Sequence, residues 1–142
     1  MKETAADKIT SIDSHVHGAQ GVYPTLADGV SLTTNAADWV LGAIVEIIPA
    51  STITDDFDIH EVLIEDINIA DKTYELVLYY GAGDVEAGRV RFSAGTTKGG
   101  VPNGTMRTPI MPANSRLRGK LAIEDGGSKT AQISVRYQLH PE

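Results

Sequence analysis

Two alternating segments, residues 116–124 and 130–139, constrain the fold more than any other feature of this chain. Apolar and polar side chains alternate in each, and a glycine-containing segment, 125–128, separates them. Successive side chains of a β-strand point to opposite faces, so each segment predicts a strand with one apolar and one polar face. The apolar positions are Leu117, Leu121 and Ile123 in the first strand and Ile133, Val135, Tyr137 and Leu139 in the second. The pattern predicts a β-hairpin packed on a core.

Short β-prone segments recur along the chain between turn signals, as in a sandwich or barrel. The predicted strands are Val30–Thr34, Trp39–Ile48, Phe57–Ile69, Thr73–Gly81, Arg89–Ala94, Thr105–Ile110, Arg116–Glu124 and Thr130–His140. Eight strands is the number in a jelly roll, so we expect an all-β, eight-stranded, jelly-roll-like β-sandwich. We assign residues 1–28 to an irregular N-terminal arm and residues 29–142 to the β-sandwich domain.

The turns and one irregular strand make this prediction more specific. Glycine accepts the positive φ of tight turns, so residues 81–88 and 125–128 are predicted to be the turns of two hairpins. Within Phe57–Ile69 the alternation changes parity near His60 and Glu61. A β-bulge at this point would return the later apolar residues to the inward face, and the strand could instead end at 65–66.

Aromatic residues are few: one Trp, two Phe and five Tyr. We predict that Trp39 is the largest core residue and that its removal costs about 3–5 kcal/mol. Tyr79 and Tyr80 are adjacent in a predicted strand, which places one in the core and one on the surface. A sugar-binding cleft would require more aromatic residues than this.

Charge is divided unevenly along the sequence. Residues 1–71 contain 13 acids and two bases, a net charge of −11, whereas residues 72–142 contain six acids and ten bases, a net charge of +4. Such a division suits self-association or docking between complementary surfaces. An uneven distribution of charge on solvated strand faces explains it equally well.

Several classes of chemistry find little support. The chain has no cysteine, so disulfides, thiolate metal sites and a cysteine nucleophile are excluded. His15 and His17 resemble the His-x-His metal motif of amidohydrolases, but 142 residues fall well short of the roughly 250 in a full eight-fold barrel. No phosphate-binding loop is present. We expect no enzymatic activity and no cofactor, with a metal-dependent hydrolase built on the two histidines as a distant alternative.

Hydropathy argues against a membrane partner. The longest strongly apolar stretch, Trp39–Ile48, is interrupted by Glu46 and is shorter than the roughly 20 residues that span a bilayer. The first residues lack the apolar segment of a secretory signal. We expect synthesis in a cytoplasm.

Cationic side chains fall on outward positions of the predicted strands. They are Arg89, Arg91, Arg116, Arg118, Lys120 and Arg136. Phosphates could bind such a row, but a pI of about 5.0 and scarce aromatic residues argue against nucleic acid. We therefore predict a protein partner. The predicted contact residues are Arg116, Arg118, Lys120 and Arg136, with Asp55, Asp56 and Asp58 on the opposite electrical side.

Residues 57–140 resemble, in order, the small β-sandwich proteins called cement or decoration proteins, which bind the outside of tailed-bacteriophage capsids. The segments that carry the resemblance are 60–65 (HEVLIE), 74–81 (YELVLYYG), 88–92 (GRVRF), 108–117 (TPIMPANSRL) and the two alternating segments at 116–139. The likeness is one of pattern, without an invariant functional motif. It implies a jelly-roll-like sandwich, association into dimers or trimers, and a clamping role between major capsid subunits.

The resemblance predicts a structural virion protein on the outer capsid surface, made in the host cytoplasm. Its partners would be the major capsid protein and a second copy of itself, as a homodimer or alternatively a trimer. A receptor- or glycan-binding domain of a tail fibre or baseplate would share the sandwich, and it is the alternative function.

Overall fold

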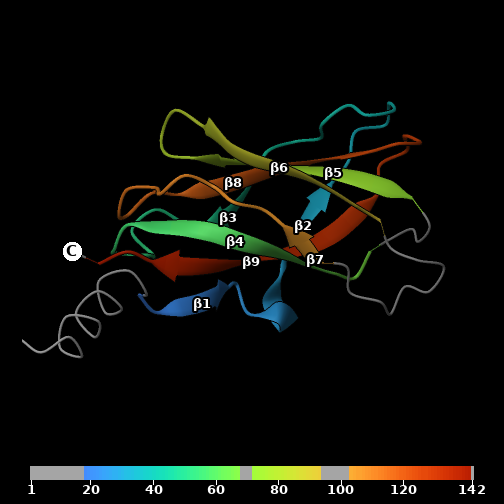
Figure 1. The fold of residues 1–142 in the computed structure, drawn as a ribbon. Helices are drawn as coiled ribbons and strands as arrows, with labels where there is room; N and C mark the ends of the chain where they lie inside the picture. The colour runs from blue at the N-terminus through green and yellow to red at the C-terminus, as the bar shows by residue number, and fades with distance from the viewer. Residues whose placement is uncertain (1–17, 68–71, 94–102, 142) are drawn as a thin grey trace, which may run out of the picture.

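The computed structural model describes residues 18–67, 72–93 and 103–141, which form two antiparallel sheets packed face to face (Figure 1). Sheet A contains β1 (Gln20–Tyr23), β2 (Val30–Thr33), β4 (Phe57–Glu65), β7 (Asn103–Thr105) and β9 (Thr130–Leu139). Sheet B contains β3 (Val45–Ile48), β5 (Thr73–Tyr80), β6 (Val85–Ser93) and β8 (Leu117–Ile123). One 3-10 turn, η1 (Leu26–Asp28), joins β1 to β2. The prediction of an all-β sandwich is confirmed.

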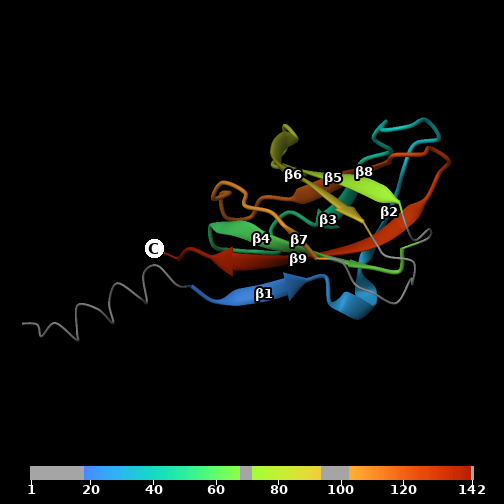
Figure 2. The ribbon, with the colours of Figure 1, turned by 45° about the vertical axis from the view of Figure 1, so that its right-hand side comes forward.

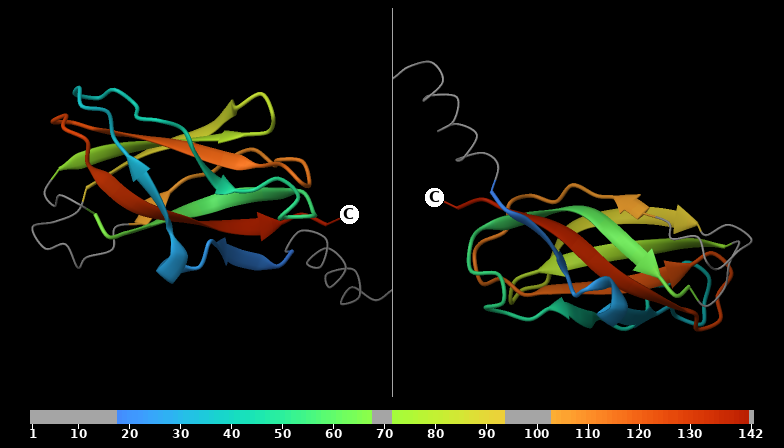
Figure 3. Two further views of the ribbon diagram at one scale, coloured as in Figure 1. Left: turned by 180° about the vertical axis from the view of Figure 1, so that it is seen from behind. Right: turned by 90° about the horizontal axis from the view of Figure 1, so that it is seen from below.

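Strand pairing is nested around the β5–β6 hairpin. Beyond that pair, β4 pairs with β7, β3 with β8 and β2 with β9. Eight strands therefore form one long antiparallel ribbon, and its rolling adds the pairs β4·β9 and β5·β8. The resulting orders, β2-β9-β4-β7 and β3-β8-β5-β6, are those of a jelly roll (Figure 3).

A ninth strand lies within the segment that the sequence assigned to the arm. Gln20–Tyr23 forms β1, which pairs with the second half of β9, next to the place where β2 pairs with its first half (Figure 2). Gly21 lies opposite Tyr137, and a Cβ on this glycine would lie 2.4 Å from the tyrosine hydroxyl oxygen. Glycine usually weakens a strand, but here its lack of a side chain makes room for the ring.

The core lies between the sheets and follows the predicted alternation. Leu117, Leu121 and Ile123 of β8 and Ile133 and Val135 of β9 are fully or almost fully buried. Tyr74 of β5 stacks on Phe92 of β6 with 5.3 Å between ring centroids. Tyr80 packs partly against this core while Tyr79 faces outward, as predicted.

The β-bulge in β4 is confirmed. The register with β9 shifts between Ile59 and Glu61, so His60 is the extra residue. Ile59 before the bulge and Val62 after it are both fully buried. The strand ends at Glu65, four residues before the predicted limit of Ile69.

One predicted hairpin is confirmed and the other is wrong. β5 and β6 pair through a turn at 81–84. β8 and β9, in contrast, belong to different sheets, so residues 124–129 form an arch across the sandwich. The alternation correctly predicted two strands and their inward faces. Each strand, however, pairs with strands from earlier parts of the chain and not with the other.

Two other predicted strands are shorter than expected. The segment Trp39–Ile48 becomes a strand only at Val45, although the Gly42 amide already donates to the Leu121 carbonyl at 2.9 Å. Of Thr105–Ile110, only Thr105 belongs to a strand, and the chain then follows β4 irregularly to an isolated bridge at Met111. No helix in the described part of the chain is long and apolar enough to cross a membrane.

Candidate protein-contact surface

The outer face of sheet B carries a network of charged and aromatic side chains, here called the sheet B face. Its members are Trp39, Glu75, Tyr79, Glu86, Arg89, Arg91, Arg118 and Lys120. The register places Glu75 opposite Arg91, and Val77 between Arg89 and Lys120. Val77 is fully buried although it belongs to this outer face, because long cationic side chains flank it.

Trp39 lies on this face rather than in the core, so the core prediction is wrong. The residue is 38% exposed, and its backbone φ is +57°. This left-handed conformation breaks the extended backbone expected of a strand and takes Trp39 out of the inward alternation. The Trp39 amide donates to the Ile123 carbonyl at 2.8 Å, which fixes the residue beside the end of β8.

Arg91 covers the Trp39 ring. The guanidinium carbon lies 4.1 Å from the ring centroid, a cation–π distance. Nε of Arg91 donates to Oε1 of Glu75 at 3.1 Å, and Nη1 of Arg89 donates to the other carboxylate oxygen at 3.3 Å. Glu75 therefore holds both arginines on the sheet.

Arg89 is held more tightly than Arg91. Its Nε and Nη2 donate to the two carboxylate oxygens of Glu86, both at 2.9 Å. This hydrogen bonding raises the pKa of Arg89 and lowers the pKa of Glu86. Beside them, the Lys120 ammonium lies 5.3 Å from the Tyr79 ring centroid, and burial raises the pKa of the Tyr79 hydroxyl.

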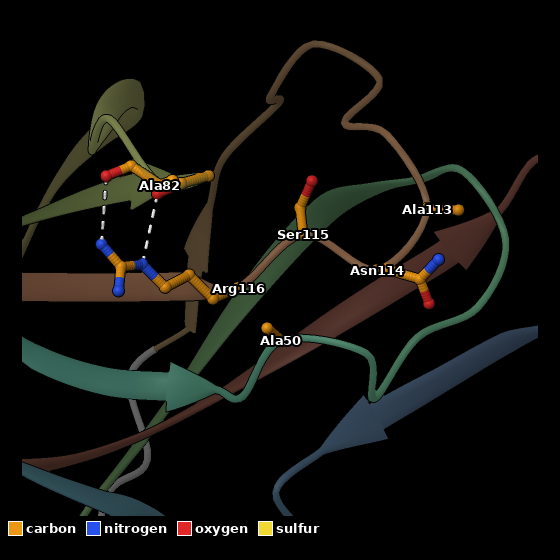
Figure 4. Close-up of a pocket in the computed structure, with 7 residues that line it drawn as sticks. Ala50, Ala82, Ala113, Asn114, Ser115 and Arg116 are labelled. Atoms are coloured by element: carbon orange, nitrogen blue, oxygen red, sulfur yellow. Dashed lines mark hydrogen bonds between the residues drawn. The ribbon is translucent and has the colours of Figure 1, made fainter.

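The predicted contacts Arg116 and Arg118 both lie against the β5–β6 turn. Arg116 donates from Nε to the Gly81 carbonyl and from Nη2 to the Ala82 carbonyl, both at 3.2 Å (Figure 4). Arg118 makes a two-point ion pair with the Asp84 carboxylate. Hydrogen bonding to Arg118 lowers the pKa of Asp84 and raises that of Arg118.

Arg136 lies on the opposite side of the molecule from the other three predicted cations. It belongs to β9 of sheet A, and its Nε donates to Oε1 of Glu61 at 3.1 Å. The structure thus brings Arg116, Arg118 and Lys120 together on β8 and its entry but does not bring Arg136 to them.

The three predicted acids lie at the start of β4, in sheet A. Oδ1 of Asp56 accepts the Ala113 amide at 2.9 Å. Oδ1 of Asp58 lies 3.0 Å from Nε2 of His60 and 3.2 Å from Nε2 of His140. Asp55 is half-buried just before them. Two of these acids therefore have partners within the chain.

Two further features of the described residues bear on possible ligands. An open pocket of about 320 Å³ lies beside the β5–β6 turn, lined by Ala50, residues 81–82 and residues 113–116 (Figure 4). Within residues 18–67, 72–93 and 103–141, no three His, Asp or Glu side chains are grouped to hold a metal ion. His15 and His17 lie outside the described residues.

Sequence reasoning placed Arg91 and Lys120 on an outward face but did not find the contact between Trp39 and Arg91. Trp39 lies in the segment before β3 and beside β8, whereas Arg91 belongs to β6, so β8 and β5 lie between the two residues. The available signal was the single tryptophan in a chain with few aromatic residues.

No protein-family model matches the chain, and no curated protein matches it. Among solved structures, that of infectious bursal disease virus Gx strain is similar to this chain. The TM-score is 0.47 and the identity 15%, over 87% of this chain and 33% of that one. The VP2 subviral particle of infectious bursal disease virus has a TM-score of 0.44 and 15% identity, over 87% of this chain and 34% of that one.

A bacterial structure has the same kind of likeness. The CBM22-1–GH10 modules of Clostridium thermocellum xylanase 10B, complexed with xylohexaose, give a TM-score of 0.38 and 13% identity over 84% of this chain and 26% of that one. This chain spans about one third of the length of the viral chains and one quarter of the xylanase chain.

Proposed function

We propose that the protein is a structural component of a tailed-phage virion, which binds the outer surface of the capsid and reinforces contacts between major capsid subunits. The observation that carries this proposal is the sheet B face, where an exposed tryptophan is stacked with arginine among paired charges. Protein interfaces concentrate Trp, Tyr and Arg, and these residues contribute most of the binding energy at such surfaces.

The resemblance to decoration proteins supports the same role. Its segments fall on β4, β5, β6, β8 and β9, from both sheets, and on residues 108–117, the connection that leads into β8. They therefore belong to the rolled ribbon itself rather than to one loop. A protein that clamps a shell needs a rigid scaffold and a complementary surface, and this ribbon supplies the scaffold.

Self-association would strengthen such binding. A dimer that engages two capsid subunits at once makes its second contact at a high effective concentration, so weak contacts suffice. We propose a homodimer, with a trimer as the alternative. Sedimentation equilibrium of the purified protein measures this state, and a monomer at micromolar concentration would contradict it.

Arg116 and Arg118 stay predicted contacts within this proposal. Because both also hold the β5–β6 turn, reversing them to Glu tests binding and turn stability together. Trp39 and Arg91 are the sharper targets, since their side chains lie outside that turn.

Quantitative mass spectrometry of purified particles tests the function. We expect copy numbers in the hundreds, comparable with the major capsid subunit, because only the shell offers so many equivalent sites. A few copies to a few dozen would place the protein in the tail instead. Absence from particles would overturn the virion role.

A receptor- or glycan-binding domain of a tail fibre or baseplate is the second candidate. The exposed Trp39 ring favours it, because sugars stack on such rings. The guanidinium of Arg91 already occupies one face of that ring, which leaves less of it for a sugar. Binding to a glycan array that Trp39→Ala abolishes would support this candidate over the capsid role.

A further inference from the structure

The side chain of Arg91 is anchored at one end and free at the other. Its guanidinium is stacked on Trp39, and its Nε is bound by Glu75. Among the residues that the structure describes, no partner is found for its two terminal amino groups. The side chain is 61% exposed, so these groups meet solvent.

This arrangement is preorganised for a planar anion. Arginine presents a rigid fork of N–H donors that matches a carboxylate or a phosphate in two-point geometry. A free arginine loses side-chain entropy when it binds, whereas the ring and the carboxylate already restrict Arg91. The strained φ of +57° at Trp39 fits a site, because such strain persists where the surrounding structure enforces it.

The surroundings favour a carboxylate on a protein over a phosphate on a nucleic acid. Three cations, Arg89, Arg91 and Lys120, and two acids, Glu75 and Glu86, lie on this part of the face, which gives it a net charge of +1. Local charge therefore attracts an anion. The chain as a whole carries −7, which repels a polyanion such as nucleic acid at long range.

We infer that Trp39 and Arg91 form a docking anchor for a carboxylate side chain on an acidic protein surface. The identity of the partner rests on the proposed function, under which the carboxylate belongs to a major capsid subunit. The terminal amino groups of Arg91 bind the two carboxylate oxygens, and Trp39 holds the guanidinium in place. Glu75 orients the guanidinium through Nε.

Arg136 provides a matched control on the opposite sheet. Its Nε also donates to a glutamate Oε1 at 3.1 Å, and its side chain is 42% exposed. It differs from Arg91 in lying on the other face and in making no ring contact within the described part of the chain. Loss of a general electrostatic attraction would affect both arginines equally.

Titration with a short glutamate-rich peptide at low salt tests the anchor. Calorimetry gives the affinity, and the single tryptophan gives one indole N–H resonance that locates binding. We expect this resonance to shift. Arg91→Ala should weaken binding by about tenfold, Arg91→Lys and Trp39→Ala by several-fold, and Arg136→Ala by less than about twofold.

Three outcomes would overturn the anchor. These are an indole resonance that does not move, equal losses in Arg91→Ala and Arg136→Ala, or tighter binding of a short single-stranded DNA than of the peptide. Melting curves establish that each variant is folded, and the milder Arg91→Lys replaces Arg91→Ala if the latter unfolds.

Particle occupancy separates this inference from the proposed function. If wild-type protein and Arg91→Ala decorate particles equally, the function stands and the anchor fails. If the peptide binds at Trp39 while the protein is absent from particles, the anchor stands and the virion role fails.

Discussion

Two glycine-containing connections have different structures. Residues 81–84 turn tightly between β5 and β6 of one sheet, and a Cβ on Gly81 would meet no atom within 4 Å. Residues 124–129 cross from sheet B to sheet A, and Gly126 is buried against the Ala36 carbonyl. Glycine thus marks where the chain reverses, whereas packing decides whether the reversal stays in one sheet.

The largest expected effect is at the arch. Gly126 has a φ of +61°, and a Cβ there would lie 2.5 Å from the Ala36 carbonyl oxygen. Gly126→Ala should therefore lower the free energy of unfolding by more than the roughly 1–2 kcal/mol of left-handed strain alone. Gly127→Ala is the control, because its φ is +86° and its nearest contact, Lys129 Cε, is 3.8 Å away. Equal losses in urea denaturation would show that the arch is not tightly packed.

At the hairpin turn we expect strain without a clash. Gly81→Ala, at a φ of +76°, should cost about 1–2 kcal/mol. Gly83→Ala in the same turn should be near neutral, since its φ is outside the left-handed region and a Cβ would meet nothing within 4 Å. Urea denaturation of both variants checks this. A loss at Gly81 that matches the loss at Gly126 would remove the contrast between the connections.

Trp39 lies on the sheet B face, with its amide bound to Ile123 just before the arch. Because it is 38% exposed and lies outside the core, Trp39→Ala should cost about 1 kcal/mol rather than the 3–5 kcal/mol of a buried aromatic residue. Thermal unfolding measures the difference. A loss as large as that of Phe57→Ala, in which a fully buried ring is removed, would return Trp39 to the core.

The smallest expected effect is a change in pH dependence at the hairpin turn. The pKa of Asp84 is lowered in the folded state, so its contribution is fully present above the unfolded value near 3.8 and is lost as pH falls through the folded value. Asp84→Asn should leave stability at neutral pH slightly reduced and should flatten its decline below about pH 4. The pair is only partly buried, so solvent screens it and the change is small. An unchanged acid profile would contradict the role of Asp84.

The local alternation of side chains predicted much of the fold, but which strands pair with each other was harder to predict. The inward rows of β8 and β9 and the bulge at His60 were all readable from side-chain parity. Which strands pair depends on contacts between distant segments, and the β8–β9 connection was therefore misassigned. β1 was missed because Gly21 looks like a break until Tyr137 is placed across from it.

The candidate surface was predictable only in part. Outward parity placed Arg118 and Lys120 correctly, and the same parity gave no means of assigning Arg136 to the other sheet. Trp39 was assigned to the core because large apolar residues are usually buried. Its left-handed φ and the arginine from a distant strand are tertiary features that no local pattern contains.

The nested ribbon also determines when the protein can finish folding during synthesis. The tip of the ribbon joins neighbouring segments, whereas its outermost pair joins residues as distant as Val30 and Ile133. Closing longer loops costs more chain entropy, so we expect the sandwich to assemble from the hairpin outward. β1, β2 and β4 all pair with β9. Sheet A therefore waits for residues 130–139 to leave the ribosome, and until then its earlier strands have unpaired edges that chaperones can bind.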